Sequence, residues 1–159
     1  MKRIALIVSV LIMFSISLSA QEQNLKIYNP GANAKDEISK AVEKAKAENK
    51  NILIQVGGNW CTWCMKFYNL IHTDYKIDSI IKADYIYMFV NWSKENKNTE
   101  VMKQLENPQR FGFPVIVVLN KEGKRIHTQD TGLLEHDKGY DSKKLIEFLK
   151  GWTVKAIEN

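Results

Sequence analysis

The chain has 159 residues, of which 45% are hydrophobic and 26% charged, and its net charge is +5 at pH 7. This length is that of one compact domain, and two cysteines are too few for a scaffold held together by disulfides. Basic and acidic residues are interleaved, as in residues 44–48, which indicates a solvated helix face rather than a nucleic-acid-binding surface.

The first twenty residues have the pattern of a secretory signal peptide. Lys2 and Arg3 precede an apolar run over residues 4–14, and small and polar residues then lead to a cleavage site after Ala20. The alternative, a retained membrane anchor, is disfavoured because the run falls short of the roughly 20 residues that span a bilayer. We therefore expect a signal peptide over 1–20, one folded domain over 21–159 without stable membrane insertion, and a periplasmic or otherwise exported protein.

Hydrophobic periodicity predicts the first helix over residues 34–48. Its apolar residues Ile38, Ala41, Val42 and Ala45 recur at the spacing of one buried stripe, and Asn33 is a suitable N-cap. Before it, residues 25–28 are predicted as a short strand in a polar lead-in.

Apolar runs rich in β-branched residues predict strands over 52–56, 85–91 and 114–119. A fourth strand over 124–129 forms a hairpin with the third, because residues 120–123 have good turn chemistry. Helices are predicted over 61–71, 74–82 and 99–105, and after residue 141. This order predicts an α/β fold with a central mixed β-sheet flanked by helices on both faces.

The run Trp60-Cys61-Thr62-Trp63-Cys64 lies where the first buried strand ends and a helix begins. At a helix start, free backbone N–H groups and the positive end of the dipole favour a thiolate at Cys61. Cys64 lies one turn further, within reach of a disulfide. In this scheme Cys61 attacks a substrate disulfide and the more buried Cys64 then releases the substrate. Trp60 would offer an apolar, hydrogen-bonding surface to an extended peptide.

The sequence gives less support to other roles for the cysteine pair. A zinc site needs two further ligands, and His72, His127 and His136 show no recognisable pairing. A purely structural disulfide across so short a loop would restrict the unfolded chain only slightly. Cu(I) suits two thiolates, but the nearest extra ligand, Met65, is expected to point away along the helix.

The pattern resembles the thioredoxin superfamily: a strand, Trp-Cys-x-x-Cys, a helix, and about fifty residues later Gly112-Phe113-Pro114 opening the hairpin. In detail it is more similar to exported bacterial thioredoxin-like proteins and to the C-terminal thioredoxin domain of the transmembrane thiol-transfer protein. The resemblance implies a thioredoxin fold with Pro114 as a cis-proline against the cysteine pair. It also implies that Phe113 contacts the substrate strand through its backbone.

Three residues or pairs depart from the family pattern. Thr62 and Trp63 stand between the cysteines, where they would tune acidity and redox potential. Gln55 replaces the buried acid that thioredoxin carries six residues before its first cysteine, and Phe113 is bulkier than the usual residue before the proline. Trp63 could equally contact substrate or cover the core, while His72, Trp92 and the tyrosines of the second strand are expected to be structural.

We thus predict a periplasmic thiol–disulfide oxidoreductase that reduces or isomerises protein disulfides. It would use no bound cofactor or metal, act on protein disulfides or thiols, and be recycled by a redox partner protein. The alternative is a thioredoxin-fold binding module for a client protein or Cu(I) with little turnover. The sequence leaves the direction of electron flow open among reductase, isomerase and oxidant.

Overall fold

The computed structural model describes residues 25–158, so the predicted signal peptide over 1–20 lies outside the described residues. A four-stranded sheet in the order β2-β1-β3-β4 forms the centre. Strand β1 (Asn51–Gly57) pairs in parallel with β2 (Tyr85–Asn91) and antiparallel with β3 (Val115–Leu119). Strand β4 (Arg125–Asp130) pairs antiparallel with β3. The sheet is therefore mixed, as predicted.

Burial of the strands follows their sequences. Every residue of β1 and β3 is buried, whereas every residue of the edge strand β4 is only partly so. The β3–β4 turn contains Gly123 at a φ of 84°, a left-handed conformation that favours glycine. The four strands predicted for the sheet and the predicted hairpin are confirmed to within about two residues.

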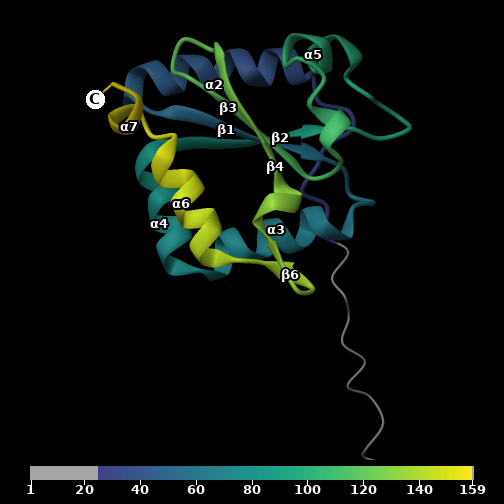
Figure 1. The fold of residues 1–159 in the computed structure, drawn as a ribbon. Coiled ribbons are helices and arrows are strands. Elements are labelled where there is room, and N and C mark those ends of the chain that lie inside the picture. Colours follow the sequence, from purple (N-terminus) through teal and green to yellow (C-terminus); the bar gives the residue numbers. More distant parts are fainter. Residues whose placement is uncertain (1–24, 159) are drawn as a thin grey trace, which may run out of the picture.

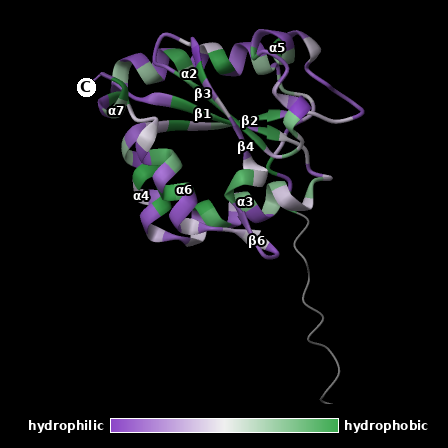
Figure 2. Ribbon diagram, in the orientation of Figure 1, coloured by the Kyte–Doolittle hydropathy of each residue, from purple (hydrophilic) through white to green (hydrophobic). Residues whose placement is uncertain are grey.

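Helices cover both faces of the sheet (Figure 1). On one face lie α2 (Ala34–Glu48) and α5 (Thr99–Gln104), which pack on one core cluster. On the other lie α3 (Thr62–Thr73), α4 (Tyr75–Asp84) and α6 (Ser142–Gly151), which form the second cluster. Figure 2 shows hydrophobic residues gathered on the central strands and on helix surfaces that face them. The predicted α/β fold with helices on both faces is confirmed.

Helix starts are set by capping side chains. Asn33, Asp74 and Asp141 accept hydrogen bonds from the first free backbone N–H groups of α2, α4 and α6. The pKa of Asp74 is lowered, first by a hydrogen bond from Ser142 at the start of α6 and then by those from its own helix. Asp74 thus joins the beginnings of two helices that are far apart in sequence.

Several short elements complete the fold. They are η1 (Pro108–Phe111), η2 (Thr131–Leu134), β5 (Glu135–His136), β6 (Gly139–Tyr140) and α7 (Val154–Glu158). β5 and β6 pair as a separate small hairpin that was not predicted. The strand predicted over 25–28 does not form, because the Tyr28 backbone bonds to the Asn59 side chain instead of to a neighbouring strand.

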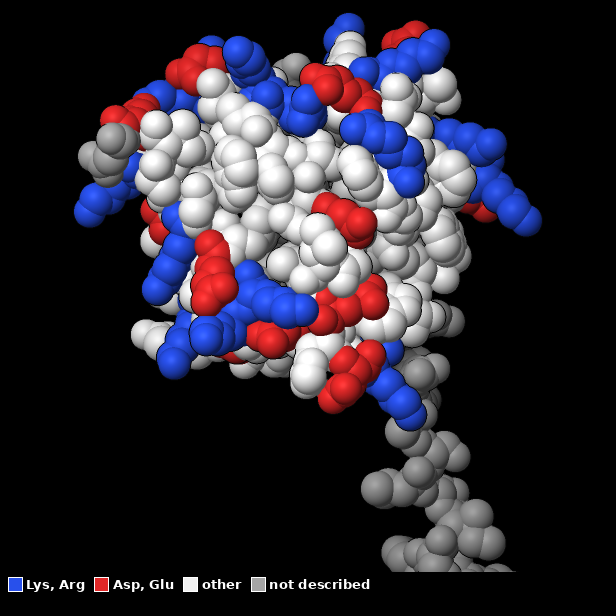
Figure 3. All heavy atoms as spheres, in the orientation of Figure 1, with Lys and Arg blue, Asp and Glu red and all other residues white. Residues whose placement is uncertain are grey.

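In the part of the chain that the structure describes, no helix has both the length and the apolar character needed to cross a bilayer. On the face shown in Figure 3, lysine and arginine side chains lie among aspartate and glutamate, around an uncharged central area.

Candidate active site

Cys61 and Cys64 form a disulfide with their Cα atoms 5.2 Å apart. Strand β1 ends at Gly57, and a turn closed by a hydrogen bond from Cys61 N to Gly58 O at 3.0 Å leads into α3. Cys61 is the N-cap of α3, as the sequence predicts. The pair therefore lies where the sheet ends and the helix begins.

The two sulfur atoms have different surroundings. Cys61 is 5% exposed and Cys64 is fully buried. The backbone N–H of Cys64 donates to Cys61 Sγ at 3.1 Å. This donor and the positive helix end favour negative charge on Cys61, so Cys61 is suited to be the nucleophile and Cys64 the buried resolving thiol.

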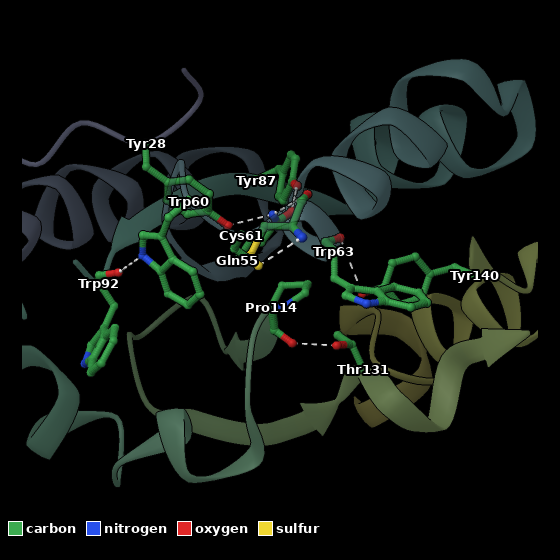
Figure 4. Close-up of a disulfide and its surroundings, with 11 residues drawn as sticks. Tyr28, Gln55, Trp60, Cys61, Trp63, Tyr87, Trp92, Pro114, Thr131 and Tyr140 are labelled. Atoms are coloured by element: carbon green, nitrogen blue, oxygen red, sulfur yellow. Dashed lines mark hydrogen bonds between the residues drawn. A yellow bond between two sulfur atoms is a disulfide. The ribbon is translucent and has the colours of Figure 1, made fainter. Parts of the chain in front are cut away.

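Aromatic rings form a wall beside the disulfide (Figure 4). The Trp60 ring is 56% exposed and contacts Phe113 edge-on at 5.4 Å between centroids. Its Nε1 donates to the Trp92 carbonyl at 3.0 Å, and Trp92 packs against Phe113 at 4.9 Å. Trp60 and Trp92 line a hollow of about 440 Å³ together with Lys94 and Glu95. The wall can therefore receive an apolar side chain next to Cys61.

The peptide bond between Phe113 and Pro114 is cis. Pro114 is buried and its carbonyl accepts a hydrogen bond from the Thr131 hydroxyl. Figure 4 shows Pro114 among the residues around the disulfide, with Trp60 and Trp63 to either side. The backbone N–H and C=O of Phe113 bond to no other described residue. Both groups are free to pair with an added strand.

The two residues between the cysteines differ in their contacts. Thr62 is exposed, whereas Trp63 is partly buried and packs edge-on against Tyr140 of β6 at 5.4 Å. The Lys66 ammonium lies 4.3 Å from the centre of the Trp63 ring, and such cation–π contacts are attractive. The β5–β6 hairpin thus holds Trp63 beside the site.

Gln55 joins a buried hydrogen-bond network behind Cys64. Its Nε2 donates to the Tyr28 hydroxyl at 2.7 Å and to the Cys64 carbonyl at 3.1 Å. The Tyr87 hydroxyl donates to its Oε1. Figure 4 shows Tyr28 and Tyr87 converging on Gln55. The position at which thioredoxin has an acid therefore holds a neutral network.

Burial keeps both tyrosines protonated. Desolvation raises the pKa of Tyr28 well above its ordinary value, although the hydrogen bond from Gln55 acts in the opposite sense. Desolvation also raises the pKa of Tyr87, and the nearby Tyr28 and Tyr68 add to the effect. Near neutral pH these two hydroxyl groups remain hydrogen-bond donors.

The expectations for Trp92 and Tyr87 as filling residues were incomplete, because both contact site residues. A signal for Trp92 exists: it follows β2, and the carboxyl ends of the parallel strands β1 and β2 lie at the same edge of the sheet. Tyr28 carries no such signal, since it comes from the irregular lead-in. The His72 ring stacks on Tyr68 at 3.9 Å and lies 6.4 Å from the ring of Tyr87, and its Nδ1 lies 2.7 Å from the Tyr68 carbonyl oxygen.

Within residues 25–158 no three or more His, Cys, Asp or Glu side chains gather into a group that could hold a metal ion. Met65 is partly buried and packs against the cluster formed by Tyr28, Cys61 and Cys64.

Comparison with known proteins places these features in context. A family model described as thioredoxin-like matches residues 33–121. Disulfide bond reductase DsbH of Chlamydia pneumoniae is 26% identical over 116 residues, which cover 67% of this chain and 70% of that protein.

Solved structures share the fold. The structure of a disulphide isomerase from Xylella fastidiosa Temecula1 matches with a TM-score of 0.70 and 24% identity, covering 79% of this chain and 95% of that one. A thioredoxin-fold protein from Helicobacter pylori matches with a TM-score of 0.51 and 23% identity, covering 69% and 73%.

Proposed function

Because the chain belongs to the thioredoxin-like family, we propose that it is a thiol–disulfide oxidoreductase that reduces or isomerises disulfides of exported proteins. The observation that carries the proposal is the disulfide between Cys61, at the start of a helix, and the buried Cys64. Relatives whose names describe a disulfide bond reductase and a disulphide isomerase support the same chemistry.

The reaction starts from the reduced pair. The Cys61 thiolate attacks one sulfur of a substrate disulfide, so that a mixed disulfide forms and the other substrate sulfur leaves as a thiolate. Cys64 then loses its proton and attacks Cys61 Sγ, which forms the Cys61–Cys64 bond and releases the second substrate thiolate. Both leaving thiolates take protons from water. Two electrons have passed from the cysteine pair to the substrate. A partner dithiol must then reduce the Cys61–Cys64 disulfide before the next reaction, and the pair is itself the redox group.

Substrate binding would use the free backbone of Phe113. An extended peptide pairing with its N–H and C=O would add a strand beside the cis-proline Pro114. Trp60 would then lie against a side chain next to the substrate cysteine, because its ring is exposed beside Cys61. Thr62 and Trp63 would tune the potential of the pair.

We place this activity in the periplasm or another exported compartment. The support is the signal-peptide pattern of residues 1–20, with a thioredoxin-like domain over 21–159. In such a compartment the oxidised pair would need a dedicated reducing partner, because disulfides persist there.

The test is the reduction of insulin by purified protein in the presence of dithiothreitol, together with reactivation of a scrambled disulfide-bonded substrate. Wild-type protein is expected to accelerate at least one reaction, and Cys61→Ser to accelerate neither. Thr73→Ser serves as a control, because it leaves both cysteines in place and lies at the opposite end of α3, where its hydroxyl donates to the Asn69 carbonyl. No acceleration by the wild type would refute the proposal, and stoichiometric copper in protein purified under reducing conditions would favour a Cu(I)-binding module instead.

A further inference from the structure

The orientation of the Gln55 amide is fixed by its partners. The Cys64 carbonyl lies 3.1 Å from Nε2, so the amide nitrogen must face it, because an amide oxygen there would oppose the carbonyl oxygen. The Tyr87 hydroxyl completes the arrangement by donating to Oε1. Both hydrogens of Nε2 are then used, one toward Cys64 and one toward Tyr28.

This orientation leaves the Tyr28 hydroxyl hydrogen free. Its oxygen accepts from Gln55, so its single hydrogen must point elsewhere, and no described residue accepts it. The ring is 3% exposed, which keeps water away from most of it. The backbone of Tyr28 is held by two hydrogen bonds with the Asn59 side chain, at 3.0 Å and 2.8 Å. The hydroxyl is therefore a buried, fixed donor in need of an acceptor.

The Cys64 sulfur lies beside that donor. A Cβ added at Gly57 would be 2.5 Å from Cys64 Sγ and 2.6 Å from Tyr28 Oη, so both atoms flank the same bare backbone position. Tyr28 also belongs to the buried cluster that contains both cysteines. A side chain at position 57 would collide with both the hydroxyl and the sulfur, so glycine there lets the two atoms approach the same stretch of backbone.

We propose that Tyr28, oriented by Gln55, donates a hydrogen bond to Cys64 Sγ whenever that sulfur is free, and so stabilises the Cys64 thiolate that resolves the mixed disulfide. Tyr28 is a positioning residue that keeps its proton throughout. The Cys64 proton passes to water or to the departing substrate thiolate, and the electron pair of the thiolate forms the bond to Cys61. The inference rests on the proposed function, because it concerns the second step of that exchange.

The titratable groups around the network are tyrosines and His72 of α3, whose ring lies 6.4 Å from that of Tyr87. Tyr87 on β2 faces Gln55, Tyr140 on β6 acts on the pKa of Tyr28, and Tyr68 on α3 acts on that of Tyr87. Burial raises the pKa of Tyr28, Tyr87 and Tyr140. A donor that holds its proton can stabilise a thiolate but cannot act as a base, which distinguishes this site from one with a buried carboxylate.

The test measures Cys64 without turnover. In the Cys61→Ser background, the rate of alkylation of Cys64 by iodoacetamide is followed against pH, with and without Tyr28→Phe. The ring remains while the donor is lost, so we expect the midpoint of the profile to move to higher pH and the alkylation rate at pH 7 to fall about tenfold. Tyr85→Phe is the matched control, because its buried hydroxyl bonds to the Leu149 carbonyl away from the cysteines.

A second measurement uses the intact pair. The rate at which Cys64 resolves a preformed mixed disulfide on Cys61 should fall in Tyr28→Phe and less in Tyr87→Phe, whose hydroxyl acts only through Gln55. Unchanged alkylation and resolution in folded Tyr28→Phe would overturn the inference. If that variant fails to fold, an unchanged profile in Tyr87→Phe would overturn it. Failure of the wild type to accelerate either insulin reduction or reactivation of the scrambled substrate would instead refute the proposed function, so the two failures are distinguishable.

Discussion

Replacing Gly57 by alanine would place a methyl group between Cys64 and Tyr28. The new Cβ would lie 2.5 Å from Cys64 Sγ, 2.6 Å from Tyr28 Oη and 3.1 Å from Tyr28 Cζ. Neither neighbour can retreat easily, because Cys64 is tied by the disulfide and Tyr28 by Gln55 and Asn59. We expect the oxidised protein to lose about 3 kcal/mol of unfolding free energy, the upper end of the range for overpacking.

The reduced protein should lose less unfolding free energy than the oxidised protein on Gly57→Ala. A free Cys64 side chain can turn to another rotamer, whereas the disulfide cannot. Unfolding and reduction form a thermodynamic cycle. If Gly57→Ala lowers the unfolding free energy of the oxidised protein more than that of the reduced protein, the reduction potential rises by about 30 mV for each 1.4 kcal/mol of that difference. Urea unfolding of both redox forms and equilibration with glutathione measure the two sides of this cycle independently.

Gly151→Ala is the matched control, since no atom lies within 4 Å of a Cβ at that helix position. It should be neutral or stabilising by up to about 1 kcal/mol. Equal unfolding free energies of wild type and Gly57→Ala in both redox forms would refute the packing argument.

Two further predictions concern substrate contact and pH. Trp60→Ala should lower kcat/KM for a peptide disulfide about tenfold, or ~1.4 kcal/mol, because it removes the exposed ring that packs on Phe113. An unchanged kcat/KM would contradict the claim that this aromatic wall contacts the substrate. Burial raises the pKa of Tyr28 and Tyr85 above the ordinary 10.0, so above that pH the unfolded chain binds fewer protons than the folded one. The contribution of these tyrosines to the unfolding free energy should therefore be fully present below about pH 10 and be lost as pH rises further. Urea midpoints that stay constant to pH 11 would contradict this prediction.

Local patterns were enough to predict most of the fold. The strand over 85–91 has the predicted bounds because its apolar run begins after Asp84 and ends at Asn91, the last residue of the strand. The first helix over 34–48 also matches, since Asn33 caps it and Asn49 ends it in a left-handed conformation. Such signals act within a few residues, so sequence alone reveals them.

The surroundings of the cysteines could be predicted only in part. Cys61 at the start of a helix follows from the preceding strand and turn. The network of Tyr28, Gln55 and Tyr87 does not, because it joins positions up to 32 residues apart through side-chain hydrogen bonds. The β5–β6 hairpin is also hidden, since strands of two residues are too short to show a period.

The central claim is that Cys61 exchanges disulfides, and trapping tests it most directly. Cys64→Ser protein, reduced and mixed with a disulfide-containing peptide, lacks the thiol that resolves the intermediate. Mass spectrometry of a digest should find the peptide joined to Cys61 in a stable mixed disulfide. Folded Cys64→Ser protein that forms no adduct at Cys61 would contradict the account.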